Sequence, residues 1–175
     1  NPNNRATITP AQTRNRAVTD NFEPGSTLKP FTIALALDLG KVKPTTLIAT
    51  APGSYTIQSA TIRDAHPGGN LTVAEVIQKS SNVGSAKIAL EHLTKEAMWR
   101  LFTSVGFGYV PHLGFPGETP GRVRPAKSWL PIEQATMSYG HGIATSLVQL
   151  ARAYSIFARD GDLVPISLVR RERAV

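Results

Sequence analysis

The chain has 175 residues and contains no cysteine, and no part of it approaches 18 consecutive apolar residues. Without cysteine it can form no disulfide bond and offers no thiolate as a nucleophile or metal ligand. A membrane-spanning helix needs about 20 apolar residues, and no signal peptide opens the sequence. Any membrane anchor is therefore expected outside these residues.

Charged residues are also few, at 18%, whereas hydrophobic residues make up 41% of the chain. This composition and length are typical of a single folded domain. The formal net charge is +7, but lysine and arginine are scattered except at Arg170–Arg173. No zinc-finger, RRM or basic-zipper pattern accompanies them, so we expect a solvated basic surface and no nucleic-acid partner.

Strand signals are sparse, and hydrophobic spacing with capping residues predicts mainly helices. Residues 1–25, 41–70 and 106–130 read as extended chain or loop, with one hairpin expected around Ser54–Ile57. The predicted helices run from Ser26 to Leu39, from the capping box Thr72–Glu75 to Lys79, from Val83 to Leu93, from the cap Thr94 to Val105, from Pro131 to a break at 139–142, and from the cap Thr145 to Asp160.

The segment Glu23–Phe31 (EPGSTLKPF) sets a serine and a lysine three positions apart at a predicted helix start. One helical turn separates the two positions, so the Ser26 hydroxyl and the Lys29 amine can touch. A serine hydroxyl becomes a useful nucleophile when a nearby base takes its proton. A neutral lysine can be that base, which requires its pKa to fall by about three units from the ordinary value of about 10.4. Desolvation and the positive end of the helix dipole act in that direction.

A second motif, Ser80-Ser81-Asn82, interrupts the predicted helices 50 or so residues later. The surrounding runs RNRAVTDNFEPGSTLKPF (Arg14–Phe31) and IQKSSNVGSAKIAL (Ile77–Leu90) resemble the S-x-x-K and S-x-N regions of class B penicillin-binding proteins. The likeness is closest to the division-type peptidoglycan D,D-transpeptidases. It continues through Glu133–Gly142 and Leu150–Tyr154.

The resemblance implies a role for each of four residues. Ser26 would be the acylated nucleophile and Lys29 its base, Ser80 would relay a proton to the leaving amine, and Asn82 would hold the substrate amide and the lysine. The Ser26 N–H would supply half of an oxyanion hole. The implied fold is α/β (α+β), the penicillin-binding and serine β-lactamase-like transpeptidase fold, of which this chain would be mostly the helical lobe. No metal or organic cofactor is implied.

The same resemblance implies a substrate, partners and a location. Stem peptides ending in D-Ala-D-Ala would be cross-linked during septal cell-wall synthesis, and β-lactams would acylate the same serine. Divisome membrane proteins, including a glycosyltransferase, would be partners. The implied location is the bacterial inner membrane, with a single-pass anchor and a periplasmic catalytic domain.

One family motif is absent, because no lysine or histidine here is followed by Ser/Thr-Gly. We therefore expect residues 1–175 to be a partial transpeptidase domain, truncated before the K-[ST]-G strand and inactive alone. Two alternatives stay open: a serine β-lactamase, although class A members carry S-D-N where this chain has Ser81, and a non-catalytic β-lactam sensor or divisome scaffold. His141 is read as a loop residue.

Overall fold

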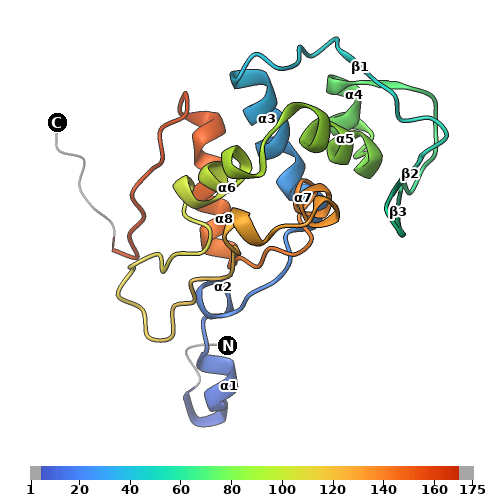
Figure 1. Cartoon of the computed structure of the whole chain (residues 1–175). Helices are drawn as coiled ribbons and strands as arrows, with labels where there is room; N and C mark the ends of the chain where they lie inside the picture. Colours follow the sequence, from blue (N-terminus) through green and yellow to red (C-terminus); the bar gives the residue numbers. More distant parts are fainter. Residues whose placement is uncertain (1–4, 170–175) are drawn as a thin grey trace.

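Helix α3 (Lys29–Asp38) packs against three other helices, α4 (Val73–Gln78), α5 (Asn82–His92) and α6 (Lys95–Ser104), as Figure 1 shows. The structure is a computed structural model that describes residues 5–169. The basic cluster Arg170–Arg173 lies outside the described residues.

The sequence of α3 explains its buried position. Side chains on several of its faces are apolar, and Phe31 and Ile33 are fully buried. A helix that is apolar nearly all round is stable when other elements cover it. The helix ends at Asp38 and is capped by Leu39, and the turn that follows contains Gly40, whose φ of 62° suits glycine.

The remaining helices complete the helical body. Helix α7 packs on α5, and α8 packs on α2. The bounds are α1 (Pro10–Thr13), α2 (Arg16–Thr19), α7 (Pro131–Met137) and α8 (Leu147–Tyr154), with 3₁₀ turns η1 (Arg5–Thr7), η2 (Gly25–Leu28), η3 (Ala126–Ser128) and η4 (Ser155–Ala158). Among residues 5–169, no helix has the length and apolar character needed to cross a membrane.

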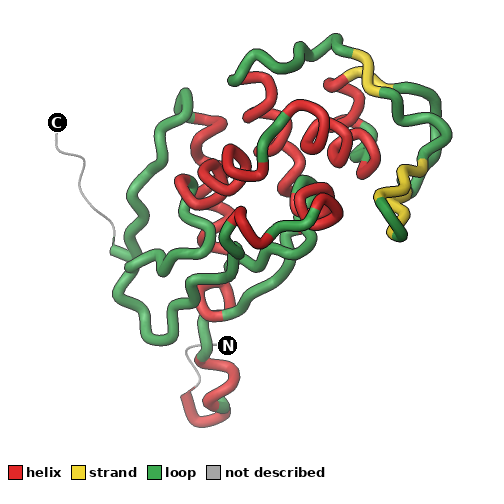
Figure 2. The backbone as a smooth tube through the Cα atoms, in the orientation of Figure 1, coloured by secondary structure: helices red, strands yellow, loops and turns green. Residues whose placement is uncertain are grey.

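The strands form two small antiparallel ladders at one side of the molecule, drawn in yellow in Figure 2. Strand β2 (Ser54–Ile57) pairs with β3 (Ala60–Arg63) as a hairpin, with Ser54 opposite Arg63. Strand β1 (Leu47–Ile48) pairs with β4 (Leu71–Thr72). The predicted mixed fold with many helices and few strands is confirmed.

Two hydrophobic clusters hold these parts together. The larger one surrounds α3 and includes Phe31, Phe102 and Trp129. The smaller one joins the β2–β3 hairpin to α5 and α7; its buried members are Ile57, Ile62, Val83, Ala86, Ala135 and Tyr139. The hairpin is therefore fixed to the helix that begins at Asn82.

Several predicted helix boundaries are confirmed by the capping bonds. The Thr72 hydroxyl accepts a hydrogen bond from the Glu75 N–H, and the Glu75 carboxylate accepts one from the Thr72 N–H. Thr94 caps α6 through the Ala97 N–H. Pro131 is the first residue of α7. The hairpin at Ser54–Ile57 is also present.

Other predictions are wrong. The cap of α8 is Ser146, because the Thr145 backbone is paired with Phe22 in a β-bridge. That helix ends at Tyr154 and continues as a 3₁₀ turn, well before Asp160. The helix expected from Ser26 begins with a 3₁₀ turn. The stretch expected to be extended contains short helices within residues 5–19, and the β1–β4 pair was not predicted.

Candidate active site

The Ser26 side chain lies in the 3₁₀ turn η2, immediately before α3. A 3₁₀ turn has three residues per turn, so side chains at i and i+3 are eclipsed. This geometry places Ser26 Oγ 2.8 Å from Lys29 Nζ. Ser26 is exposed, whereas Lys29 is 2% exposed. The hydroxyl is thus open to a substrate while the amine behind it is shielded from water.

Contacts from two distant segments hold η2 in place. The Gly25 N–H donates to the Gly140 carbonyl at 3.2 Å, and the Tyr154 hydroxyl donates to the Thr27 carbonyl at 2.6 Å. The chains at Gly25 and Gly140 approach so closely that a Cβ at Gly140 would lie 2.1 Å from the Gly25 carbonyl oxygen. Glycine at position 140 is therefore required for the position of η2, the turn that carries Ser26.

The Ser80–Asn82 turn joins α4 to α5 by a Schellman motif. The Ser80 N–H donates to the Ile77 carbonyl and the Ser81 N–H to the Val76 carbonyl, both at 3.0 Å. Ser80 has a φ of 53°, in the left-handed region where glycine is usual at this position. Such strain in a non-glycine residue costs on the order of 1–3 kcal/mol. This backbone conformation directs both the carbonyl oxygen and the hydroxyl of Ser80 toward Lys29.

Four oxygen atoms surround the Lys29 amine. Nζ lies 2.8 Å from Ser26 Oγ, 2.8 Å from the Ser80 carbonyl oxygen, 3.0 Å from Ser80 Oγ and 2.8 Å from Asn82 Oδ1. The structure therefore brings all four predicted site residues together. They come from one turn and one helix start that are far apart in sequence.

The surroundings of Lys29 make its neutral amine easier to form than it is in water. Burial lowers its pKa from 10.5 to about 8, against an opposing effect of the Asp64 carboxylate. A neutral amine has two N–H donors and one lone pair. In the neutral amine, donation to the Ser80 carbonyl and to Asn82 Oδ1 leaves the lone pair directed toward the Ser26 and Ser80 hydroxyls, where it can accept the Ser26 proton. This is the arrangement that activates a serine nucleophile.

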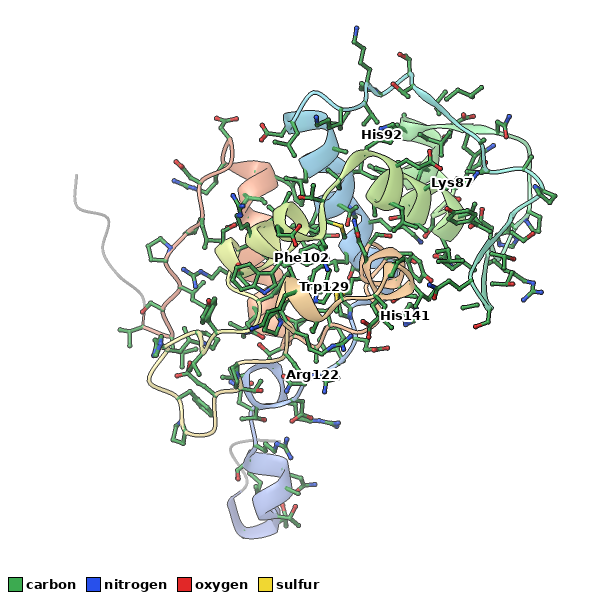
Figure 3. The ribbon with its side chains drawn as sticks, in the orientation of Figure 1. Lys87, His92, Phe102, Arg122, Trp129 and His141 are labelled. Carbon is green, nitrogen blue, oxygen red and sulfur yellow. The ribbon has the colours of Figure 1, made fainter. Side chains whose placement is uncertain are left out.

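The loop after α7 forms one rim of the site. The Tyr139 ring centroid is 5.9 Å from Lys29 Nζ, and burial raises the pKa of its hydroxyl. His141, labelled in Figure 3, lies in this loop, and its Nδ1 is 3.2 Å from Glu23 Oε2. The Glu23 carboxylate also accepts the Gly142 N–H, which lowers its pKa. Both side chains are more than half exposed, so the pair adds little stability.

Sequence reasoning did not identify Asp64 as part of this arrangement. Its carboxylate contacts Ser81 and Val83, which follow it by 17 and 19 residues. No local pattern marks such a contact, since the hairpin fold creates it. Among residues 5–169, no group of three or more histidine, aspartate or glutamate side chains is arranged to hold a metal ion.

The sequence matches known proteins over nearly its whole length. The penicillin binding protein transpeptidase domain matches residues 1–174. The chain is 49% identical over 170 residues to the probable peptidoglycan D,D-transpeptidase PenA of Neisseria flavescens, covering 97% of this chain and 42% of that protein. It is 38% identical over 170 residues to the peptidoglycan D,D-transpeptidase FtsI of Escherichia coli K12, covering 97% and 28%.

A solved structure has the same fold. The apo transpeptidase (TP) domain of penicillin-binding protein 3 from Burkholderia pseudomallei superposes with a TM-score of 0.89 at 51% identity. The match covers 93% of this chain and 49% of that structure. The chain thus spans less than half the length of these relatives and of that solved domain.

Proposed function

The chain belongs to the penicillin-binding protein transpeptidase family, and on this premise we propose that it carries the acylation centre of a peptidoglycan D,D-transpeptidase. The supporting observation is the buried Lys29 amine, held within 2.8 Å of the exposed Ser26 hydroxyl and oriented by Ser80 and Asn82. Acyl transfer through a serine ester needs a base beside the hydroxyl, and the Lys29 amine is placed to be that base.

In the first step, Ser26 Oγ attacks the penultimate D-alanine carbonyl of a stem peptide while neutral Lys29 takes the hydroxyl proton. The new C–O bond forms as the carbonyl becomes an oxyanion. The Ser26 N–H lies in the first turn of η2, where intrahelical bonding gives it no partner, and it can donate to that oxyanion.

In the second step, the C–N bond breaks and the terminal D-alanine leaves. Its amine needs a proton, and Ser80 Oγ, 3.0 Å from Lys29 Nζ, can pass the proton from the lysinium to the leaving nitrogen. An amine of a neighbouring peptide then attacks the ester, which forms the cross-link and frees Ser26. Asn82 keeps Lys29 in place throughout and offers its amide to the substrate.

A second oxyanion donor and a grip on the substrate carboxylate are also needed, and we propose that both lie outside residues 1–175. The sequence holds no K-[ST]-G motif, and the solved relative is about twice as long. Loss of one oxyanion donor costs on the order of 10²–10³ in rate. Residues 1–175 alone should therefore acylate slowly.

The proposal extends to the cellular setting. We propose that the full-length protein acts in septal peptidoglycan synthesis on the periplasmic side of the inner membrane, with divisome proteins, including a glycosyltransferase, as partners. The support is the similarity to a protein named FtsI. β-Lactams resemble D-Ala-D-Ala and would form a slowly hydrolysed ester on Ser26.

Mass spectrometry of the full-length protein after penicillin treatment tests this proposal. The intact mass should rise by one drug molecule and stay raised, and Ser26→Ala should abolish the increase. A matched control is Ser59→Ala, at an exposed serine of the hairpin turn. Labelling that survives Ser26→Ala would refute the assignment, and rapid drug hydrolysis with no lasting adduct would indicate a β-lactamase instead.

A further inference from the structure

Asp64 lies directly after strand β3, at the base of the β2–β3 hairpin. Its backbone N–H donates to the Gly53 carbonyl at 2.9 Å. Ile57 and Ile62 of the hairpin are buried against Val83 at the start of α5. The position of Asp64 relative to α5 is thus set by packing as well as by its own side chain.

The Asp64 carboxylate caps the first turn of α5. Oδ2 accepts a hydrogen bond from Ser81 Oγ at 2.7 Å, and Oδ1 accepts one from the Val83 N–H at 2.9 Å. Ser81 Oγ in turn accepts from the Gly84 N–H at 2.8 Å. A carboxylate at a helix N-terminus satisfies free N–H groups and is attracted by the helix dipole. Ser81, the middle residue of the motif, therefore serves to connect the turn to Asp64.

The residue before Asp64 determines which way the Asn82 amide faces. The Arg63 carbonyl is 3.1 Å from Asn82 Nδ2 and can only accept a hydrogen bond. Asn82 must therefore direct its NH₂ group to Arg63 and its oxygen to Lys29. The end of β3 thus acts on Lys29 by two routes, through Asn82 and through the turn that carries Ser80.

The Asp64 carboxylate also contributes charge. It raises the pKa of Lys29, against the lowering caused by burial. The neighbouring Ser80 and Asn82 are neutral. Tyr139 is a further titratable group beside the amine, and its raised hydroxyl pKa keeps it neutral near pH 7.

We propose that Asp64 is a positioning residue that clamps the Ser80–Asn82 turn against Lys29 and biases the charge of that lysine. The proposal rests on the proposed acylation chemistry, in which Lys29 must be both close to Ser26 and able to lose a proton. Asp64 acts through Ser81, Val83 and Lys29 and touches no substrate. Its two effects oppose each other at neutral pH, because the clamp favours acylation and the negative charge favours the protonated amine.

The substitution Asp64→Asn separates these effects. The new amide oxygen can accept the Val83 N–H, and its NH₂ group can donate to Ser81 Oγ, so the turn keeps its position while the charge is lost. The acid limb of the acylation pH profile, measured with a fluorescent penicillin on the full-length protein, should then move to lower pH. Asp64→Ala removes the clamp and should lower the plateau rate about 10- to 100-fold, as expected for the loss of charge-assisted hydrogen bonds.

A control and a second measurement keep the outcomes distinct. Glu91→Gln removes the same charge from an exposed position in the last turn of α5 and should leave the profile unchanged. NMR titration of the ¹³Cε resonance of Lys29 follows the pKa without any acylation. If Ser26 is acylated in the wild type, but Asp64→Asn shifts neither the profile nor the titration and Asp64→Ala keeps the plateau rate, the role of Asp64 is refuted and the proposed function stands. If the wild type is not acylated at Ser26 at all, the proposed function fails instead.

Discussion

Lys29 Nζ lies 2.8 Å from Asn82 Oδ1, although 53 residues separate the two in the sequence. The contact exists because α3 and α5 pack side by side, so that the N-terminal ends of the two helices meet. Buried bonds fix this arrangement: the hydroxyls of Thr32 on α3 and Ser85 on α5 both donate to the Ser138 carbonyl at 3.0 Å. Ser138 is the C-cap of α7, so the position of the amine depends on α3, α5 and α7.

Replacement of Lys29 by arginine tests its role as a base. Arginine keeps the positive charge but does not deprotonate in proteins, and general-base catalysis contributes about 10²–10⁴-fold. Lys29→Arg should lower the second-order acylation rate by that range. Lys127→Arg, at an exposed lysine, should not change it. A rate near that of the wild type would mean that the lysine acts only through its charge.

The pH dependence of acylation should follow the titration of Lys29. The pKa of about 8 means that the neutral amine is a minor form at pH 7, about a tenth of the total, and that it becomes dominant above pH 8. The rate should therefore rise as the pH increases from 6 to 9. Stopped-flow measurement of acylation by a fluorescent penicillin checks this, and a flat profile over that range would contradict it.

The same shift predicts a pH-dependent stability. The pKa of Lys29 is lower in the folded state than its ordinary value of 10.5, so the unfolded chain binds more protons between pH 8 and 10.5. The stability that Lys29 contributes is fully present above its ordinary pKa of 10.5, and it is lost as the pH falls through about 8. The full effect is on the order of 3 kcal/mol. Urea unfolding measures this from pH 7 to 10. The unfolding free energy of the wild type should rise with pH through the titration of Lys29, and Lys29→Met should lack this rise.

Ser80→Gly should affect stability and activity in opposite directions. Glycine relieves the positive φ of Ser80, which should stabilise the fold by about 1 kcal/mol. The loss of the hydroxyl removes the proposed proton relay and should slow acylation at least tenfold. Gln58→Gly is the matched control, because Gln58 has a φ of 55° in the hairpin turn and should gain stability with no change in rate. Normal acylation by Ser80→Gly would rule out the relay.

Gly140→Ala should displace η2, the turn that carries Ser26. The new Cβ would meet the Gly25 backbone at 2.1 Å, and the φ of 87° adds strain. We expect a loss of several kcal/mol in unfolding free energy, the size typical of disruptive substitutions, and a much slower acylation. Gly142→Ala shares the positive φ, but its Cβ meets nothing closer than Met137 at 3.7 Å. It should lose only about 1 kcal/mol, and equal losses in the two variants would argue against the close contact.

Much of the site could be read from the sequence. The pairing of Ser26 with Lys29 follows from their spacing, because three residues correspond to one turn whether the turn is α or 3₁₀. The capping box at Thr72 and the break at Ser80–Asn82 are local as well. Such features depend on backbone and side-chain groups within a few residues of each other, and the sequence lists those groups directly.

The tertiary structure decided the rest. Packing buried Lys29, which lowers its pKa, and brought Asn82 and both oxygens of Ser80 to its amine. The β-bridge between Phe22 and Thr145 moved the N-cap of α8 to Ser146. The hairpin carried Asp64 to the N-terminus of α5. These outcomes come from contacts between residues far apart in the chain, whose energies depend on how whole elements pack, and local sequence patterns do not contain that information.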